Sequence, residues 1–206
     1  SSSTTTTSTT TLPERPAVAA VGDSNLELVR DLLPTSVPDL DVYVEAVVGL
    51  TANDALPATD RAVAHEPDAV VVVLGTNDAR DAPSAGDDLT AIRRVAVRLD
   101  AVPCVRWVTV NDSSPFPSMN AQARTINAEL RRLAGGRHRF GIIPWADDLA
   151  AHPSWLMADG VHNSEEGRIE LVRRLATAFR ECLAGSASAS VTNLHPGRFQ
   201  GVDRPA

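Results

Sequence analysis

The sequence predicts an α/β fold in which a parallel sheet of five strands lies between two layers of helices. Short apolar runs alternate along the chain with longer amphipathic segments, which is typical of βαβ units. The run from Ala69 to Leu74 has the length and the uniform apolar character of a strand that is buried on both faces. A chain of 206 residues, 43% of them hydrophobic, is also large enough to bury a core in one domain.

Five short apolar runs are the expected strands. Because helical patterns separate them, neighbouring strands are expected to be parallel. The expected strands are 17–21, 41–46, 69–74, 106–110 and 140–143.

Amphipathic segments fill the gaps between these strands. The last one has the clearest pattern, since Ile169, Val172, Leu175 and Phe179 recur at helical spacing. Together with the strands, the helices predict one three-layer α/β/α sandwich without internal repeats. The expected helices are 26–33, 52–65, 87–100, 121–133 and 165–183.

Both ends of the chain differ in composition from the middle. Residues 1–16 begin with an unbroken run of Ser and Thr, and we interpret them as a linker. There is no initiator Met and no signal segment, so we expect that a further segment preceded Ser1. Linkers of this kind commonly tether an exported domain to a signal peptide or a membrane anchor, which favours an extracytoplasmic location over the cytosol. The domain is expected to span 17–184, and residues 185–206 are expected to be a flexible tail.

The charge balance argues against nucleic acid as a partner. The net charge is -7, all 19 basic residues are Arg, and no basic stripe interrupts the acidic balance. No stretch reaches the roughly 18 consecutive apolar residues of a membrane span. We therefore do not expect nucleic acid as a partner, and we expect no part of this sequence to cross a bilayer.

Residues capable of chemistry follow several of the expected strands. In an open α/β sheet, ligands bind beyond the carboxyl ends of the strands. The first strand is followed by Gly22-Asp23-Ser24, the second by Gly49 and the third by Gly75-Thr76-Asn77-Asp78. A fourth group, Asp159-Gly160-Val161-His162, precedes the last helix.

These residue types are the parts of an acyl-transfer site. A serine hydroxyl such as that of Ser24 needs a base, for which His162 is the candidate, and the base needs an acceptor such as Asp159. The backbone amides of Ser24 and Gly49 and the side-chain amide of Asn77 are candidate donors for an oxyanion hole. Ser24 would also lie at a helix N-terminus, which favours negative charge.

The four groups resemble the motif blocks of the SGNH (GDSL-type) hydrolases, which are named for Ser, Gly, Asn and His. The resemblance covers roughly residues 17–183, and Asn25 replaces the Leu that usually follows the serine. It implies a flavodoxin-like sheet, a serine esterase mechanism that uses no metal, and an open site for esters of varied size.

Each candidate residue also has a structural alternative. The Asp and Ser of the first block suit a helix N-cap, the single Gly suits a turn, and the Asn suits a cap after its strand. The last Asp and His suit a surface loop before the helix cap at Asn163 or Ser164. The presence of all blocks in one chain favours the catalytic interpretation.

No metal or nucleotide cofactor is expected. The remaining histidines have no partner at ligand spacing, and the sequence contains no His-Glu-x-x-His, Cys-x-x-Cys, Gly-x-Gly-x-x-Gly or Walker loop. Paired carboxylates at 87–88 and 147–148 are more typical of solvated charges than of a glycosidase. The other histidines are His65, His138, His152 and His195.

The leading prediction is a serine esterase acting on a small-molecule or glycan-linked ester. The segments 143–145 and 152–155 also resemble the SGNH domains attached to membrane acyltransferases of cell-envelope glycans, so an O-acyltransferase with the same triad stays open. A non-catalytic glycan-binding module is a third possibility, against which the intact triad argues. The large aromatic residues are more typical of core or rim than of a sugar platform; they are Trp107, Phe116, Trp145 and Trp155.

The two cysteines are expected at the same end of the domain. Cys104 precedes the fourth strand at the end of the sheet opposite the catalytic loops, and the last helix descends by about 27 Å to bring Cys182 to that end. In an exported chain this favours a disulfide over two buried thiols.

Overall fold

A five-stranded parallel sheet forms the centre of the computed structural model, which describes residues 15–81, 85–137 and 139–192. The strand order is β2-β1-β3-β4-β5, with every neighbouring pair parallel. This is the flavodoxin-like order that the family resemblance implied. The strands are β1 (Ala17–Gly22), β2 (Asp41–Ala46), β3 (Ala69–Val73), β4 (Val105–Val108) and β5 (Phe140–Ile143).

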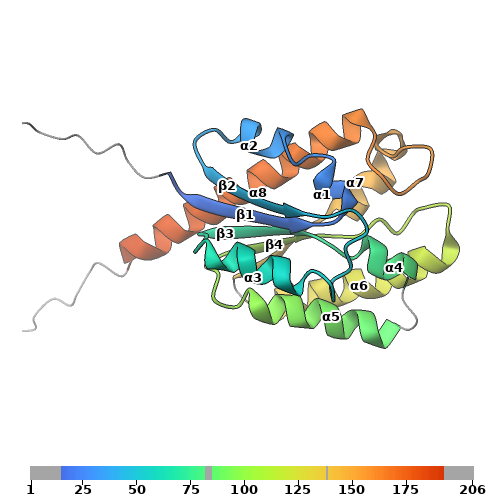
Figure 1. The fold of residues 1–206 in the computed structure, drawn as a ribbon, viewed down its shortest axis with the longest axis horizontal. Coiled ribbons are helices and arrows are strands. Elements are labelled where there is room, and N and C mark those ends of the chain that lie inside the picture. Colours follow the sequence, from blue (N-terminus) through green and yellow to red (C-terminus); the bar gives the residue numbers. More distant parts are fainter. Residues whose placement is uncertain (1–14, 82–84, 138, 193–206) are drawn as a thin grey trace, which may run out of the picture.

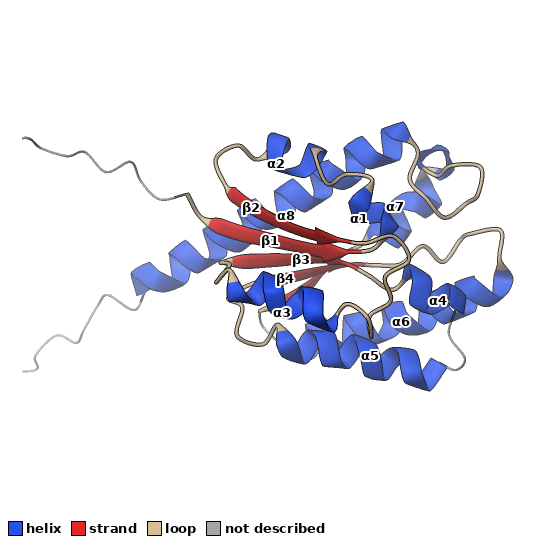
Figure 2. Cartoon of the chain, viewed as in Figure 1, coloured by secondary structure: helices blue, strands red, loops and turns tan. Residues whose placement is uncertain are grey.

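Helices cover both faces of the sheet, as Figures 1 and 2 show. One layer contains α3, α4, α5 and α6, and the other contains α1, α2, α7 and α8. The predicted three-layer α/β/α sandwich is therefore confirmed. The helices are α1 (Ser24–Glu27), α2 (Leu32–Ser36), α3 (Leu56–Ala64), α4 (Thr76–Asp81), α5 (Ala85–Arg98), α6 (Pro117–Gly136), α7 (Trp145–Ala151) and α8 (Glu165–Thr192), with a 3-10 turn η1 at Pro153–Trp155.

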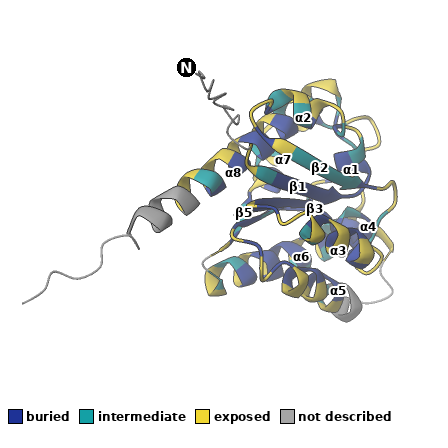
Figure 3. Cartoon of the chain, turned by 60° about the vertical axis from the view of Figure 1, so that its left-hand side comes forward, coloured by how far each residue is buried: buried dark blue, intermediate teal, exposed yellow. Residues whose placement is uncertain are grey.

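Two apolar cores fill the spaces between the layers. Side chains of one strand alternate between them, so Val70 and Val72 of β3 face α3, α5 and α6 while Val71 faces α8. The central strands are almost wholly buried, whereas the edge strand β2 is partly exposed (Figure 3). The sheet is thus a rigid base for the loops that follow its strands.

The expected helix 26–33 is two shorter helices. Asp23 caps α1, so this helix begins at Ser24, earlier than expected, and α2 begins only at Leu32. Pro34 explains the break: within a continuous helix its ring would meet the carbonyl of Arg30, but within the first turn of α2 it is tolerated.

Two further helices have no counterpart in the sequence-based prediction. Helix α4 follows β3 directly, and α7 follows β5. Both are too short to display a helical repeat of apolar residues.

The last helix is longer than expected. α8 continues to Thr192, so residues 185–192 are helical, where the sequence analysis expected the start of the tail. Once the packed part of a helix has formed, each added residue costs little, and further apolar periodicity is not needed. Residues 1–14 of the expected linker and residues 193–206 of the expected tail lie outside the described residues.

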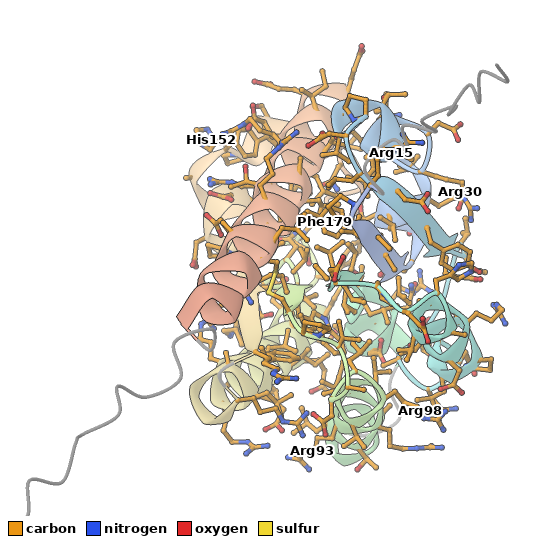
Figure 4. All side chains as sticks on the ribbon, turned by 90° about the vertical axis from the view of Figure 1, so that its left-hand side faces the viewer. Arg15, Arg30, Arg93, Arg98, His152 and Phe179 are labelled. Carbon is orange, nitrogen blue, oxygen red and sulfur yellow. A yellow bond between two sulfur atoms is a disulfide. The ribbon has the colours of Figure 1, made fainter. Side chains whose placement is uncertain are left out.

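Cys104 and Cys182 form a disulfide, with 5.6 Å between their Cα atoms. The bond joins the start of β4 to α8 at the amino ends of the strands, the end that faces the viewer in Figure 4. The expectation of a disulfide at the end opposite the catalytic loops is confirmed. No helix within the described residues combines the length and hydrophobicity that crossing a bilayer requires.

Candidate active site

Ser24 lies at the carboxyl end of β1, as the first residue of α1. Asp23 Oδ1 accepts a hydrogen bond from the Asn25 amide at 3.0 Å, which caps this helix, and the Asp23 amide donates to the carbonyl oxygen of Val73 at the end of β3 (2.9 Å). The serine is 7% exposed and is held by a backbone that is anchored to two strands.

His162 and Asp159 complete a hydrogen-bonded chain with Ser24. Ser24 Oγ lies 3.0 Å from His162 Nε2, and His162 Nδ1 lies 2.7 Å from Asp159 Oδ2. The three residues that the sequence analysis selected are therefore brought together, although 138 positions separate the serine from the histidine. This geometry can transfer the serine proton to an imidazole whose tautomer a carboxylate fixes.

The Asp159 carboxylate is held ionised by its hydrogen bonds. Partial burial desolvates it and opposes ionisation, but the side chain and amide of His162 and the amide of Val161 donate to it and lower its pKa to about 2. A carboxylate with this pKa stays negative through the neutral range and can stabilise a protonated His162.

The loop that carries His162 is tied to its neighbours. The amide of Met157 donates to the His162 carbonyl oxygen at 2.8 Å, and Asn111 Nδ2 donates to the Gly160 carbonyl oxygen at 3.0 Å. Ser164 Oγ accepts from the Gly167 amide at 3.3 Å, so Ser164 caps α8. These bonds give the loop one conformation directly before the last helix.

Asn77 lies in the first turn of α4, next to the turn that contains Gly49. Its Nδ2 donates to the carbonyl oxygen of Leu50 at 3.1 Å. The adjacent Asp78 accepts from the Ala52 amide with both carboxylate oxygens, at 2.9 and 3.1 Å. The two side chains fix the turn after β2, and a primary amide such as that of Asn77 carries a second N–H that can point to substrate.

Gly49 and Gly75 both have positive φ. Gly49 has φ +80 in an exposed part of its turn, and the conformation suits glycine. Gly75 has φ +120, and a Cβ there would lie 2.6 Å from Val110 Cγ2, so this glycine lets the chain turn directly into α4. Together the two glycines help to place Gly49 and Asn77 at the carboxyl end of the sheet, where Ser24 also lies.

Asp23 is a buried carboxyl group beside the site. Desolvation is the main cause that raises its pKa to about 7, and the Asn25 amide only partly offsets it. Its Oδ2 is buried without a hydrogen-bond partner among the described residues. Asp23 is thus a buried carboxyl group near Ser24 whose charge changes close to neutral pH.

Three polar residues near the site were given no catalytic or positioning role by the sequence analysis. Asp78 orders the turn after β2, and Asn25 bonds to Asn163 beside the His162 loop. The sequence offered a signal for Asn25, since it departs from the usual Leu of the resembled family. The contacts of Asp78 and Asn163 depend on tertiary structure alone.

The two tryptophans that flank the His162 loop are packed in the core. Trp145 and Trp155 stack on each other with 5.5 Å between ring centroids and are 4% and 8% exposed, so they belong to the core. In the part of the chain that the structure describes, no three His, Cys, Asp or Glu residues are grouped as a metal site. His138 and His195 lie outside that part.

The model of the GDSL-like lipase/acylhydrolase family matches residues 3–168 of the chain. No curated protein matches this chain.

Several solved structures share the fold. A GDSL-like lipase from Bacteroides thetaiotaomicron aligns with a TM-score of 0.69 and 18% identity, over 84% of this chain and 92% of its own. The C-terminal catalytic domain of peptidoglycan O-acetyltransferase A from Streptococcus pneumoniae aligns with a TM-score of 0.68 and 21% identity, over 82% and 95%. An acetylxylan esterase from Geobacillus stearothermophilus aligns with a TM-score of 0.62 and 17% identity, over 80% and 94%.

Proposed function

The chain belongs to the GDSL-like lipase/acylhydrolase family, and from this premise we propose that it is a serine esterase that forms an acyl-enzyme on Ser24. The observation that carries the proposal is the hydrogen-bonded chain from Ser24 through His162 to Asp159, with separations of 3.0 and 2.7 Å. The substrate is a small-molecule or glycan-linked ester.

Acylation begins when Ser24 Oγ attacks the ester carbonyl carbon and its proton passes to His162 Nε2. The carbonyl electron pair moves onto the oxygen, and the imidazolium is stabilised by the Asp159 carboxylate. When the tetrahedral intermediate collapses, the bond to the alcohol oxygen breaks, and His162 returns the proton to the leaving alcohol.

The oxyanion of this intermediate needs preorganised donors. The backbone amides of Ser24 and Gly49 and the second N–H of Asn77 are the proposed donors. The bond from Asn77 to Leu50 supports this role because it fixes the amide before substrate binds.

Deacylation repeats these steps with water as the nucleophile. His162 removes a proton from water, the oxygen attacks the acyl carbon, and Ser24 Oγ leaves with the proton that His162 returns. The carboxylic acid is released and the free serine is restored.

Replacement of the nucleophile tests the proposal. Ser24→Ala is expected to reduce hydrolysis of p-nitrophenyl acetate to the residual level that binding and oxyanion effects sustain, with the fold intact. Ser36→Ala is a matched control, since the Ser36 hydroxyl donates to the Leu33 carbonyl oxygen in α2, and this variant should retain full turnover. Wild-type turnover by Ser24→Ala would refute the mechanism.

An O-acyltransferase is the second candidate function. It is favoured by the likeness to the catalytic domain of the S. pneumoniae peptidoglycan O-acetyltransferase and by the Ser/Thr-rich residues 1–16, which would tether the domain to an envelope component. In this case a sugar hydroxyl resolves the acyl-enzyme in place of water. Mass spectrometry of glycan oligosaccharides incubated with enzyme and an ester donor would reveal O-acylated products; free acid alone would support the esterase.

The proposed location is extracytoplasmic. The Cys104–Cys182 disulfide supports it, because disulfides persist in oxidising compartments and are rare in a reducing cytosol. Fractionation of the producing cells, followed by alkylation and mass spectrometry, tests the location. A reduced protein in the cytosolic fraction would contradict it.

A further inference from the structure

Asn25 and Asn163 form a buried pair of side chains next to the Ser24–His162 contact. Asn25 directly follows the proposed nucleophile, and Asn163 directly follows the proposed base. The two residues are 7% and 1% exposed. They therefore join, inside the protein, the two segments that must meet for proton transfer.

One oxygen of Asn25 makes both bonds of the pair. Asn25 Oδ1 accepts from the Asn163 amide at 3.3 Å and from Asn163 Nδ2 at 3.1 Å. A backbone N–H can only donate, so the Asn25 atom that it meets must be the carbonyl oxygen. The side-chain atom of Asn163 that meets the same oxygen must then be the donor nitrogen Nδ2. The orientations of both side-chain amide groups are therefore fixed.

Apart from the Ser24–His162 contact itself, the other hydrogen bonds described above do not join the His162 loop to the segment that carries Ser24. Asp159 lies in the same loop as His162, three positions away, so their bond fixes the ring to the loop and moves with it. Asn111 ties the loop to the segment after β4. Asn25, in contrast, ties it to the helix that begins at Ser24.

Neighbouring residues cover the imidazole only partly, so its position depends on its hydrogen bonds and on the loop that carries it. The His162 side chain is 33% exposed. A base must stay within about 2.6–3.2 Å of the proton it accepts, and small displacements of a catalytic group reduce the rate steeply.

We propose that Asn25 is a positioning residue that sets the separation of Ser24 and His162 by holding Asn163. The proposal rests on the proposed serine esterase function.

Stability alone does not account for this polar pair. Asn163 Oδ1 is buried with no hydrogen-bond partner among the described residues. Asn163 and Asn25 both line a small cavity of about 20 Å³. Burying polar side chains is costly unless they are hydrogen-bonded, and an apolar pair at these positions would carry no such cost. What the polar pair adds is the two hydrogen bonds from Asn163 to Asn25 Oδ1.

Substitution of Asn25 tests the proposal through two readouts. Asn25→Leu and Asn25→Ala both remove the acceptor oxygen, one with a larger and one with a smaller side chain. Each is expected to lower kcat for p-nitrophenyl acetate about 10-fold or more, with KM changed less than about 2-fold. The rate at which phenylmethylsulfonyl fluoride modifies Ser24 should fall by a similar factor, since this reaction also needs His162 as base.

A double-variant cycle identifies Asn163 as the link. Asn163→Ala removes one of the two bonds and should cost less than Asn25→Ala. The double variant Asn25→Ala, Asn163→Ala should be no slower than Asn25→Ala alone. Independent, multiplied losses would show that Asn25 does not act through Asn163.

Thr59→Ala is the matched control, because Thr59 is wholly buried in α3 and its hydroxyl donates to the Ala55 carbonyl oxygen at 2.8 Å. It is expected to lower the melting temperature without changing kcat. If both Asn25 variants, assayed well below their melting temperatures, kept kcat within 2-fold of wild type, or if Thr59→Ala lost kcat equally, the proposal would be overturned.

The sulfonyl reaction separates this proposal from the proposed function. If the wild-type protein were modified at Ser24 but hydrolysed no ester, the esterase proposal would fail. The labelling rates of the Asn25 variants would still decide whether Asn25 positions the pair.

Discussion

The side-chain amide of Asn77 lies 3.1 Å from the carbonyl oxygen of Leu50, so a residue in the first turn of α4 holds the turn after β2. Neighbouring Asp78 binds the Ala52 amide in the same turn. The proposed oxyanion donors at Gly49 and Asn77 are therefore parts of one hydrogen-bonded unit. Their positions relative to each other do not depend on substrate.

The first prediction concerns Asn77. Asn77→Ala is expected to lower kcat by on the order of 10²- to 10³-fold with a much smaller change in KM, because the amide donates mainly to the charge that develops in the transition state. Asn77→Asp should be at least as damaging, since a carboxylate adds repulsion. Asp81→Asn, at the exposed end of α4, is the control and should keep kcat. Unfolding of Asn77→Ala without a selective loss of kcat would identify Asn77 as a structural cap.

The second prediction is a pH dependence of stability caused by Asp23. Its pKa is raised from 3.8 to about 7 by burial, so between these values the unfolded chain releases a proton that the folded chain retains. The contribution of Asp23 to the free energy of unfolding therefore falls as pH rises from about 4 to 7, by at most roughly 4 kcal/mol. Asp23→Asn keeps the cap acceptor and should remove this loss. Urea unfolding of both proteins between pH 4 and 8 measures the difference.

Asp159 gives the opposite sign in a separate range. Its pKa is lowered to about 2, so the stability it contributes is present above its unfolded value of 3.8 and is lost as pH falls toward 2.

The comparison with Asp23→Asn decides the assignment to Asp23. If the free energy of unfolding changed with pH equally in wild type and Asp23→Asn between pH 4 and 7, that assignment would be contradicted.

The third prediction concerns the disulfide. It closes a loop with a sequence separation of 78, for which chain entropy predicts about 4.5 kcal/mol of stabilisation. The double variant Cys104→Ala, Cys182→Ala should melt at a lower temperature but retain kcat, because the bond lies at the end of the sheet opposite Ser24. Reducing agent should lower the melting temperature of wild type and leave that of the variant unchanged. Two alkylated cysteines in the unreduced wild type would refute the bond.

The fourth prediction is that chelators have no effect on ester hydrolysis. The proposed steps use only Ser24, His162, Asp159 and amide donors. Activity after dialysis against EDTA should equal that of the untreated enzyme. A loss that an added divalent ion restores would overturn this part of the mechanism.

The strands and the longer helices could be predicted from local pattern. β2 and β5 have the predicted bounds, because an apolar run between turn residues is a local signal. α4 and α7 were missed, since helices this short are stabilised mainly by what they pack against. The extension of α8 to Thr192 was missed for a related reason, because it continues a helix whose earlier turns are already packed.

By itself, the sequence determined the fold class and the residue types of the site, with Ser24, Asn77 and His162 in their order along the chain. Only the tertiary structure decided how these residues are held. The bond of Asn25 to Asn163 and that of Asp78 to Ala52 join segments far apart in sequence. Such contacts depend on how strands, turns and loops are placed in space. A hydrogen bond forms only when the donor–acceptor distance falls within a range a few tenths of an ångström wide. A local pattern carries no information at that precision.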